Sequence, residues 1–316
     1  MKYKRLGNTD MDLSVLTIGT WAMGGLGYGA VEEKECIEAI HAMIDQGVNH
    51  IDTAWIYGLG HSDEVVGKAI KGLRDKVYIT TKAGFRNPAD GQGPNFPDCS
   101  PAWLRECLDK SLVQMGVDYF DEFLVHFPDR GVAFAEIADC VNSFIKEGKV
   151  RYVGVSNFQI TDMEEMSQYM SITANQVGYS MIGRGEEEGM RWAKEHGIGV
   201  MTHSSLGSGL LTGAIRTMPD LPDNDVRKMY SNNFTEPRFS QIMKLLETLD
   251  KVAESRSVPV AQVAINWNVR KDFVTTSLVG VRNVKEALEN CKAVDWELTD
   301  DEMKLIDDAI VECLGE

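Results

Sequence analysis

Four side chains that can hold or transfer protons stand where three candidate strands end. The stretch VNHIDTAWIYG (48–58) begins as a β-branched strand, reaches Asp52 at its expected end and carries Tyr57 just beyond. The run VYITTKAGF leads in the same way to Lys82, and FDEFLVHF leads to His126. A single Asp or Lys after a strand is usually a cap or a rim residue, and a single Tyr in a loop usually only covers apolar surface. If the three strands are neighbours in one sheet, however, a carboxylate, a phenol, an ammonium and an imidazole meet at one edge.

These charges suit the group to protonating an oxygen atom. A tyrosine has an unperturbed pKa of about 10, and a cation at ~4 Å favours the phenolate by roughly 4 kcal/mol at an effective dielectric of ~20, or about 3 pKa units. Lys82 is therefore expected to bring the pKa of Tyr57 towards neutrality, where a proton donor works best. Asp52 would keep Lys82 charged, and His126 would orient a carbonyl oxygen. The group has no evident nucleophile, so it needs a partner that gives or takes a hydride.

The composition is that of an ordinary globular chain. Of its 316 residues, 43% are hydrophobic and 25% charged, and no linker-like tract divides it, so we expect one domain over residues 1–316. The net charge of −16 argues against nucleic acid or an anionic membrane as a partner. Six scattered cysteines without a CxxC pair indicate free thiols in a reducing compartment. No segment resembles a signal core or a membrane span, so a cytoplasmic protein is expected.

Hydrophobic periodicity predicts strands that alternate with helices. The strands are expected at 16–19, 50–54, 76–82, 119–126, 150–155, 173–177, 198–202 and 275–279. The helices are expected at 32–46, 62–70, 100–115, 134–147, 161–169, 186–196, 239–254, 259–270, 283–292 and 300–311. Ser62 and Ser100 are the predicted N-caps of two of them.

This alternation predicts parallel strands with helical crossovers, which means an α/β fold. Eight units favour a closed (β/α)8 TIM barrel, preceded by an N-terminal β-hairpin at 3–15 and followed by extra C-terminal helices. An open doubly wound sheet is the alternative. In a barrel, the active site lies at the carboxyl ends of the strands.

Two motif matches are not specific, and the histidines match no metal-binding motif. Gly25–Ala30 fits the G-x-G-x-x-A spacing of a dinucleotide fingerprint, but the loop is long and the next strand ends in an acid followed by a tyrosine. Tyr78 and Lys82 fit a YxxxK spacing that requires a helix, and this run is too β-branched for one. The six histidines form no close ligand pair, so no metal site is expected.

At these residues the sequence resembles the aldo-keto reductase superfamily, and the resemblance covers nearly the whole chain. It is carried by GTWAMGG, HIDTAWIYG, ITTKAG, LVHFPD, VGVSNF, NQVGYS, SLGSGLLTG and VGVRNVKEALEN. The resemblance implies a (β/α)8 barrel that binds NADP(H) without a Rossmann domain. It also implies a catalytic tetrad in which a hydride reaches a carbonyl carbon while the tyrosine protonates the oxygen; the reverse reaction oxidises an alcohol. The tetrad would be Asp52, Tyr57, Lys82 and His126.

The same resemblance assigns the cofactor site. The residues implied for the nicotinamide end are Thr20, Trp21, Ser156, Asn157, Gln176 and His203. Those implied for the pyrophosphate are Ser204, Leu206, Ser208, Gly209 and Leu210, and those for the adenosine end are Gly280, Arg282, Glu286 and Asn290. His203 stands where the family usually has an aromatic ring, and an imidazole is smaller and can titrate.

Glu286 also departs from the family, which commonly has Gln or Arg there. Its carboxylate would repel a 2′-phosphate but accept a bond from a 2′-hydroxyl, whereas Arg282 favours the phosphate. NADPH is the expected cofactor, with use of NADH as an additional hypothesis.

The substrate pocket is expected beneath loops 20–30, 83–100, 127–133 and 207–238. Its expected lining is Trp21, Trp55, Tyr57, Phe85, His126 and Phe127. Arg86, Asp129 and Arg130 would add polar contacts, which indicates a sugar, a polyol or a small hydroxylated aldehyde. The alternative is that both arginines are solvated loop charges.

Three functions remain open from the sequence. The first is an NAD(P)H-dependent reductase or alcohol dehydrogenase acting on a small carbonyl compound, as a monomer or weak homo-oligomer. The second is a cofactor-binding regulatory or scaffold subunit with little turnover, as in the channel-associated members of the family. The third is a barrel enzyme without nicotinamide, such as an isomerase. The complete tetrad favours the first, and SLGSGLLTG and VGVRN oppose the third.

Overall fold

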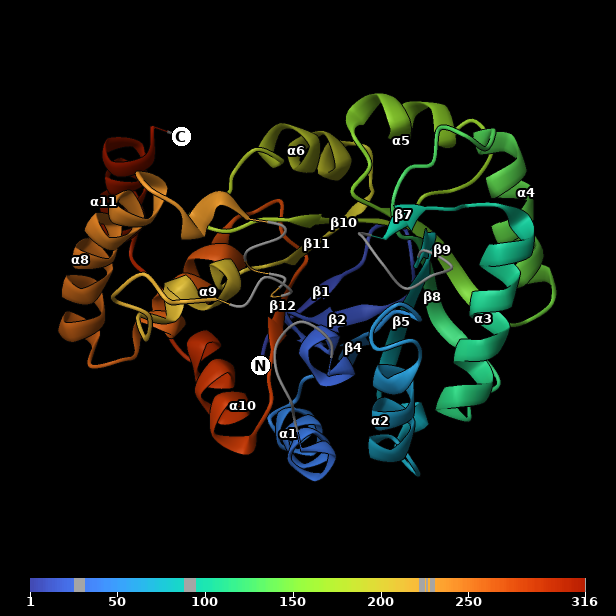
Figure 1. Ribbon diagram of the computed structural model, residues 1–316, viewed down its shortest axis with the longest axis horizontal. Coiled ribbons are helices and arrows are strands. Elements are labelled where there is room, and N and C mark those ends of the chain that lie inside the picture. The colour runs from blue at the N-terminus through green and yellow to red at the C-terminus, as the bar shows by residue number, and fades with distance from the viewer. Residues whose placement is uncertain (26–31, 88–94, 222–224, 226, 228–230, 316) are drawn as a thin grey trace.

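The strands form a closed, all-parallel barrel. The computed structural model describes residues 1–25, 32–87, 95–221, 225, 227 and 231–315 (Figure 1). Around the barrel the strand order is β10-β11-β12-β3-β4-β5-β8-β9, and each strand pairs in parallel with its neighbours. The strands are β3 (Leu16–Gly19), β4 (His50–Asp52), β5 (Tyr78–Ala83), β8 (Phe120–Val125), β9 (Val150–Ser156), β10 (Ala174–Gly178), β11 (Gly199–His203) and β12 (Thr276–Gly280). The barrel prediction is thus confirmed, and the open sheet is excluded.

Helices surround the strands on the outside (Figure 1). They are α1 (Glu33–Asp45), α2 (His61–Ala69), α3 (Pro101–Met115), α4 (Phe134–Lys146), α5 (Ile160–Met166), α6 (Glu187–Glu195), α8 (Arg238–Arg256), α9 (Val260–Arg270), α10 (Val284–Cys291) and α11 (Asp300–Leu314). Helix α4 illustrates why: Ile137, Val141 and Phe144 recur at helical spacing, and all three are fully buried. Within the described residues, none of these helices has the length and apolarity needed to cross a bilayer.

Several predicted boundaries differ from those observed. The loop expected at 83–100 contains a two-stranded piece, because β6 (Phe85–Arg86) pairs with β7 (Phe96–Pro97). Ser100 precedes α3 as expected, with Pro101 in its first turn. Ser62 is not a cap, since the N-cap of α2 is Gly60 and the Ser62 hydroxyl instead donates to Thr20 Oγ1 over 2.6 Å. Residues 26–31, which include most of the rejected dinucleotide motif, lie outside the described residues.

A hairpin closes the amino-terminal end of the barrel. Strands β1 (Tyr3–Arg5) and β2 (Asp12–Ser14) pair in antiparallel fashion. Three residues of this hairpin segment, Leu6, Met11 and Leu13, are buried against side chains from the barrel strands, among them Leu124 and Met201. This apolar plug keeps water from one end of the barrel.

A chain of buried polar side chains crosses the interior of the barrel. Thr276 donates to Ser14 O, and contacts of 2.7 to 3.0 Å then join Thr276 to Thr17, Thr17 to His50, His50 to Thr80 and Thr80 to Glu122. Each contact needs one proton. The three hydroxyls and a neutral imidazole supply four protons for five contacts. The chain is complete only when Glu122 or His50 carries one more.

The effects of burial on the pKa values of Glu122 and His50 place that proton on Glu122. Burial raises the pKa of Glu122 to about 7, with Thr173 and Thr80 acting in the opposite direction. Burial also lowers the pKa of His50 to about 3, so the imidazole is neutral near pH 7. The acid form of Glu122 can donate to Thr80 and complete the chain. At pH values below the pKa of Glu122, a layer of neutral hydrogen bonds therefore crosses the barrel.

Replacing Glu122 with Gln should make folding stability less dependent on pH. The unfolded carboxyl group ionises near its ordinary pKa and the buried one only near 7, so rising pH favours the unfolded state between those values. The free energy of unfolding of the wild type should fall by about 3 kcal/mol across this window relative to E122Q. Urea titrations from pH 4 to 8 measure the difference. The exposed Glu188→Gln is the control, and a difference between wild type and E122Q that does not vary with pH would contradict the assignment.

Candidate active site

Lys82 lies at the centre of the charged group predicted from the strand ends. Its Nζ donates to Asp52 Oδ1 over 2.6 Å, to the carbonyl oxygen of Thr53 over 2.9 Å and to Tyr57 Oη over 3.3 Å. Lys82 and Asp52 are each only 1% exposed. The three donors of the ammonium are thus used by three neighbours. The Tyr57 ring is edge-on to that of His126, with 6.0 Å between centroids, so direct contacts link all four groups.

The turn after β4 holds Tyr57 in place. Tyr57 N donates to Ala54 O over 2.9 Å, and the first turn of α2 donates back to Tyr57 O through Ser62 N over 3.2 Å. Gly58 follows with φ +68°, and a Cβ there would lie 2.2 Å from Gly24 O. Only glycine fits this close approach of two loops. The phenol is therefore fixed by backbone contacts on both sides.

The ion pair keeps its charges despite burial. Burial acts to lower the pKa of Lys82, but Asp52 and Tyr57 outweigh it, so the pKa is raised and the ammonium stays protonated. Burial raises the pKa of Asp52, and the bonds from Lys82 and Gln176 oppose this rise.

The pKa of Tyr57 differs from the sequence expectation. Burial raises it above its usual value of 10.0, and the opposing effect of Lys82 is smaller. The prediction that Lys82 alone brings Tyr57 towards neutrality was wrong for the protein without ligands, because it counted the cation and left out the loss of water around the phenolate.

His126 is a neutral hydrogen-bonding group. Burial, followed by the nearby Lys82 and His203, lowers its pKa well below 6.5. Its Nδ1 is buried and has no partner among the described residues. A neutral imidazole has one donor and one acceptor, so His126 can bond a substrate oxygen without bringing a second positive charge.

Aromatic rings surround the phenol and the imidazole. Trp21 stacks on Tyr57 with centroids 6.0 Å apart, Phe85 meets His126 edge-on at 5.0 Å, and Phe127 lies 5.4 Å from Phe85. These contacts bring together five of the six residues predicted to line the pocket. They form an apolar wall beside the tetrad.

Trp55, the sixth residue, is placed differently. Its ring lies where a Cβ on Gly60 would be 2.5 Å away, and Lys110 Nζ of α3 is 5.4 Å from the ring centroid. These contacts connect Trp55 to helices α2 and α3 rather than to the rings around Tyr57.

The charged residues predicted to give the pocket polar contacts are engaged in ion pairs and turns. Arg86 pairs with Asp98 at 2.9 Å and lies 4.2 Å from the Trp103 ring centroid. Arg130 pairs with Asp162 and Glu165. Asp129 accepts from the backbone of Cys99 and Gly131 at 2.9 and 2.8 Å. These contacts brace loops, and polar contacts from these three residues to a sugar stay a prediction.

The residues expected at the nicotinamide end form one hydrogen-bonded group. Ser156 Oγ donates to Gln176 O over 2.9 Å, and Asn157 Nδ2 donates to His126 O and Ser156 Oγ over 3.1 and 3.0 Å. Asn157 has φ +62°, an uncommon value outside glycine. Gln176 Nε2 donates to Asp52 Oδ2 over 2.7 Å, which joins this group directly to the tetrad.

His203 lies beside this hydrogen-bonded group. A Cβ on Gly178 would lie 3.2 Å from its ring, so glycine leaves room for the imidazole. Burial, followed by Lys82, lowers the pKa of His203 to about 4. The imidazole is therefore uncharged near pH 7 and can serve as a flat surface.

Thr20 and Trp21 have different positions. The Thr20 hydroxyl is fully buried and donates to Asp52 O over 2.9 Å, so it braces the end of β4. Trp21, at 38% exposure, lies at the rim.

The segment expected to bind pyrophosphate has an unusual backbone. The 3₁₀ segment Gly207–Thr212 is interrupted by Ser208 at φ +55° and Gly209 at φ +92°, and Ser204 also has φ +59°. Gly207 N donates to Ser204 O over 2.8 Å and Gly209 N to Leu206 O over 3.0 Å, so these residues form tight turns within the segment. Leu206 is half-buried and Leu210 fully buried, so their side chains anchor the segment. Binding of the pyrophosphate at this segment stays a prediction from the resemblance.

The adenosine end combines an open surface with a charge pair. Gly280 is exposed, and a Cβ there would touch nothing. Arg282 lies beside Glu286: its backbone N donates to the carboxylate over 3.0 Å and its guanidinium over 3.2 Å. Asn290 is 6% exposed.

Sequence reasoning missed two polar residues behind the tetrad. Thr53 gives its carbonyl to Lys82, and its hydroxyl donates to Asp63 over 2.8 Å. Asp63 is fully buried, also accepts from Ser111 over 2.7 Å, and has its pKa raised to about 6 by burial. An Asp in the first turn of a helix is usually exposed to solvent and stabilises the start of the helix. Nothing in the sequence therefore indicated this contact.

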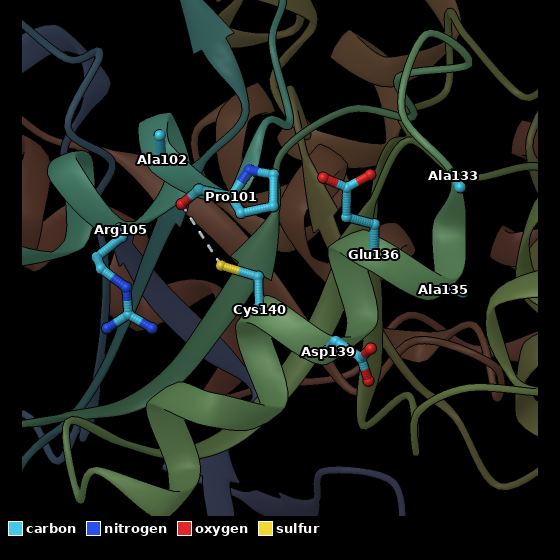
Figure 2. A pocket seen from close by; sticks show the side chains of 8 residues that line it. All are labelled: Pro101, Ala102, Arg105, Ala133, Ala135, Glu136, Asp139 and Cys140. Atoms are coloured by element: carbon cyan, nitrogen blue, oxygen red, sulfur yellow. Dashed lines mark hydrogen bonds between the residues drawn. The ribbon is translucent and has the colours of Figure 1, made fainter.

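A cavity lies outside the barrel, and none of these groups lines it. It has a volume of about 550 Å³ between the first turns of α3 and α4 (Figure 2) and is lined by Pro101, Ala102, Arg105, Ala133, Ala135, Glu136, Asp139 and Cys140. Its one cation, Arg105, is already bonded to Glu147 at 2.8 Å. The cavity holds none of the tetrad, and no catalytic role follows from it.

Comparison with known proteins agrees with this geometry. A sequence model of the Aldo/keto reductase family matches residues 15–311. The aldo-keto reductase YhdN of Bacillus subtilis (strain 168) is 33% identical over 309 residues, which cover 96% of this chain and 92% of that protein. The NADH-specific methylglyoxal reductase of Escherichia coli (strain K12) is 30% identical over 323 residues, or 97% of each protein. Among solved structures, the glycerol dehydrogenase AKR11B4 from Gluconobacter oxydans has a TM-score of 0.90 at 30% identity, covering 100% of this chain and 97% of that one.

Replacing Lys82 with Met should destabilise the fold, because it leaves Asp52 buried without its cation. We expect a loss of about 3 kcal/mol in the free energy of unfolding at pH 8, shrinking towards acid pH as Asp52 takes up a proton. The double variant D52N/K82M should recover most of the loss. Urea unfolding at several pH values measures both. A double variant as unstable as K82M would mean that packing, and not charge, is responsible.

Proposed function

The chain belongs to the Aldo/keto reductase family and is an oxidoreductase of carbonyl and alcohol groups; from this premise we propose that Tyr57 is its general acid and base. The observation that carries the proposal is the bond from the buried Lys82 to Tyr57 Oη. A reduced nicotinamide, when bound, supplies a hydride to the carbonyl carbon. Everything else in the reaction concerns the oxygen, where negative charge develops as the hydride arrives.

Each of the four side chains has a separate role in the proton transfer to this oxygen. Tyr57 donates its proton to the oxygen, and Lys82 stabilises the phenolate that remains. Asp52 keeps Lys82 protonated inside the barrel, where an unpaired ammonium would lose its proton. His126, neutral and close to the phenol, donates a second hydrogen bond to the same oxygen and orients it. In the reverse direction the phenolate removes the proton from an alcohol.

We propose a small aldehyde or ketone, or the matching alcohol, as the substrate. The apolar rings of Trp21, Phe85 and Phe127 lie beside the two polar groups, Tyr57 and His126, whose rings contact each other edge-on. The names of two relatives, a methylglyoxal reductase and a glycerol dehydrogenase, fit three-carbon compounds. Methylglyoxal, glyceraldehyde and glycerol are therefore the first candidates.

We propose that the protein uses NADPH and also accepts NADH. Arg282 is exposed at the adenosine end and suits a 2′-phosphate. Its guanidinium is 3.2 Å from Glu286, however. The carboxylate offsets part of that attraction and can accept a bond from a 2′-hydroxyl. The pair therefore reduces discrimination between the two cofactors.

Replacing Tyr57 with Phe should remove turnover. General acid catalysis contributes roughly a hundredfold to ten-thousandfold, and Phe keeps the ring but not the proton. The test follows cofactor absorbance with NADPH or NADH and a panel of small aldehydes and sugars. Tyr3→Phe is the matched control, because Tyr3 Oη bonds Gly47 O at the far end of the barrel.

Two results would overturn the proposed activity. Tight cofactor binding without turnover by the wild type would support the regulatory-subunit alternative. Absence of cofactor binding would support a barrel enzyme without nicotinamide.

Replacing Glu286 with Gln should increase the preference for NADPH. Removing the carboxylate leaves Arg282 to the 2′-phosphate, and an exposed charge–phosphate contact is worth roughly a tenfold change. The measurement is the ratio of kcat/KM for NADPH to that for NADH at low and high salt, because screening should reduce the gain. Arg282→Gln should move the ratio the opposite way, and an unchanged ratio in both variants would show that the pair does not meet the ribose.

A further inference from the structure

Gln176 crosses the mouth of the barrel to reach the catalytic acid. It lies on β10, and Asp52 ends β4, which is four strands away in either direction around the closed eight-stranded order. Even so, Gln176 Nε2 is 2.7 Å from Asp52 Oδ2. Both side chains are 1% exposed. Contacts between opposite strands are possible only through long side chains that meet on the barrel axis.

The two oxygens of Asp52 have different donors. Lys82 Nζ binds Oδ1 over 2.6 Å, and the Gln176 amide binds Oδ2 over 2.7 Å. The amide nitrogen must be the group that faces Asp52, because the amide oxygen would oppose a carboxylate oxygen. A donor to a charged acceptor is worth more than a neutral hydrogen bond. Gln176 therefore stabilises the carboxylate that keeps Lys82 charged.

The backbone of Gln176 lies beside the expected nicotinamide site. The backbone oxygen of Gln176 accepts from Ser156 Oγ and Asn157 N, each over 2.9 Å. Those neighbours are the residues assigned to the nicotinamide carboxamide. Within the described part of the chain, Gln176 Oε1 accepts no hydrogen bond. It is therefore available to accept one from the carboxamide of a bound nicotinamide.

We propose that Gln176 is a positioning residue that couples nicotinamide binding to the Asp52–Lys82 pair and, through it, to Tyr57. The coupling rests on the proposed function, since it needs a nicotinamide at Oε1. It goes beyond that function, because Gln176 acts on the catalytic acid as well as on the cofactor.

The direction of the effect follows from the hydrogen bonds. When Oε1 accepts a bond, the amide is polarised and Nε2 becomes a stronger donor. Asp52 then shares more of its charge with Gln176 and attracts Lys82 less. The ammonium charge acts more fully on Tyr57 Oη and favours loss of its proton. Without Gln176, Asp52 competes more strongly for the Lys82 proton, and Tyr57 ionises at higher pH.

Other titratable groups near Tyr57 do not provide this coupling. His126 and His203 face the cavity from β8 and β11, and both have lowered pKa values that keep them neutral. Glu122 on β8 and His50 on β4 lie in the hydrogen-bonded layer described above. Asp63 on α2 contacts Thr53 and Ser111. Gln176 alone among the described side chains bonds Asp52 from the nicotinamide side.

The first test measures the ionisation of Tyr57 in the protein without cofactor. Fluorotyrosine at position 57 lowers the ionisation range of the phenol, and fluorine NMR follows its titration. Gln176→Met keeps the length of the side chain and removes the donor. We expect the pKa of residue 57 to rise by about one unit, because a charge-assisted bond to Asp52 is lost and its effect is only partly transmitted.

The matched control is Asn266→Leu. Asn266 is 1% exposed, and its amide donates to Ala293 O and Trp296 O over 2.8 and 2.7 Å, on α9 and away from the tetrad. This variant loses buried amide bonds of the same kind, so it reproduces any general loosening of the fold. The pKa of residue 57 should match the wild type in this control.

The second test adds reduced cofactor, whose nicotinamide ring is uncharged. In the wild type, binding should lower the pKa of residue 57, and by reciprocity the Kd for cofactor should tighten as pH rises through that range. Both changes should be absent in Gln176→Met. Fluorescence titration of the Kd at several pH values measures the effect without turnover.

The outcomes separate the coupling from the proposed function. If Gln176→Met binds cofactor more weakly but leaves the pKa of residue 57 unchanged, Gln176 is only a carboxamide ligand and the coupling is wrong. If the wild type binds neither NADPH nor NADH, the proposed function is wrong, and the titration without cofactor still decides whether Gln176 acts on Tyr57. A raised pKa in the control as well would assign the effect to general loosening and overturn the coupling.

Discussion

The ammonium of Lys82, enclosed at the mouth of the barrel, is the constraint around which the site is arranged. An unpaired cation at that depth would be deprotonated, so the chain supplies Asp52, a backbone carbonyl and the phenol of Tyr57 as its three acceptors. A different structural feature positions each acceptor. Asp52 ends a strand, Thr53 is fixed by a buried carboxylate, and Tyr57 is fixed by a turn that only glycine allows.

Three regions follow one another along the interior of the barrel. The charged Lys82 site comes first, the hydrogen-bonded polar side chains come next, and the apolar hairpin residues come last. The chain from Thr276 to Glu122 needs one extra proton, and the hairpin residues beneath it are apolar. The buried Asp52–Lys82 pair is thus separated from the hairpin by a hydrogen-bonded layer. Polar groups in the middle layer satisfy one another, so they do not compete with Tyr57 for Lys82.

The sequence predicted the features that depend on strand periodicity. Asp52, Lys82 and His126 follow strand ends, and a parallel barrel brings strand ends together whatever the loops do. It did not predict the bond between Gln176 and Asp52, because a contact between opposite strands depends on barrel radius and side-chain length. The pKa of Tyr57 was misjudged because desolvation depends on the surrounding atoms. The ion pairs of Arg86 and Arg130 were not predicted, because their partners, such as Asp98 and Glu165, lie on other segments.

The first strands and the last one are joined across almost the whole length of the chain. Lys4 Nζ donates to Val274 O over 2.6 Å, and Thr276 donates to Ser14 O over 2.8 Å. During synthesis the hairpin therefore leaves the ribosome long before its partner strand exists. Until β12 emerges, the barrel keeps two open strand edges, and such edges favour aggregation. Closure of the barrel around Lys82 therefore depends on a strand that is made late, because β12 pairs with both β11 and β3.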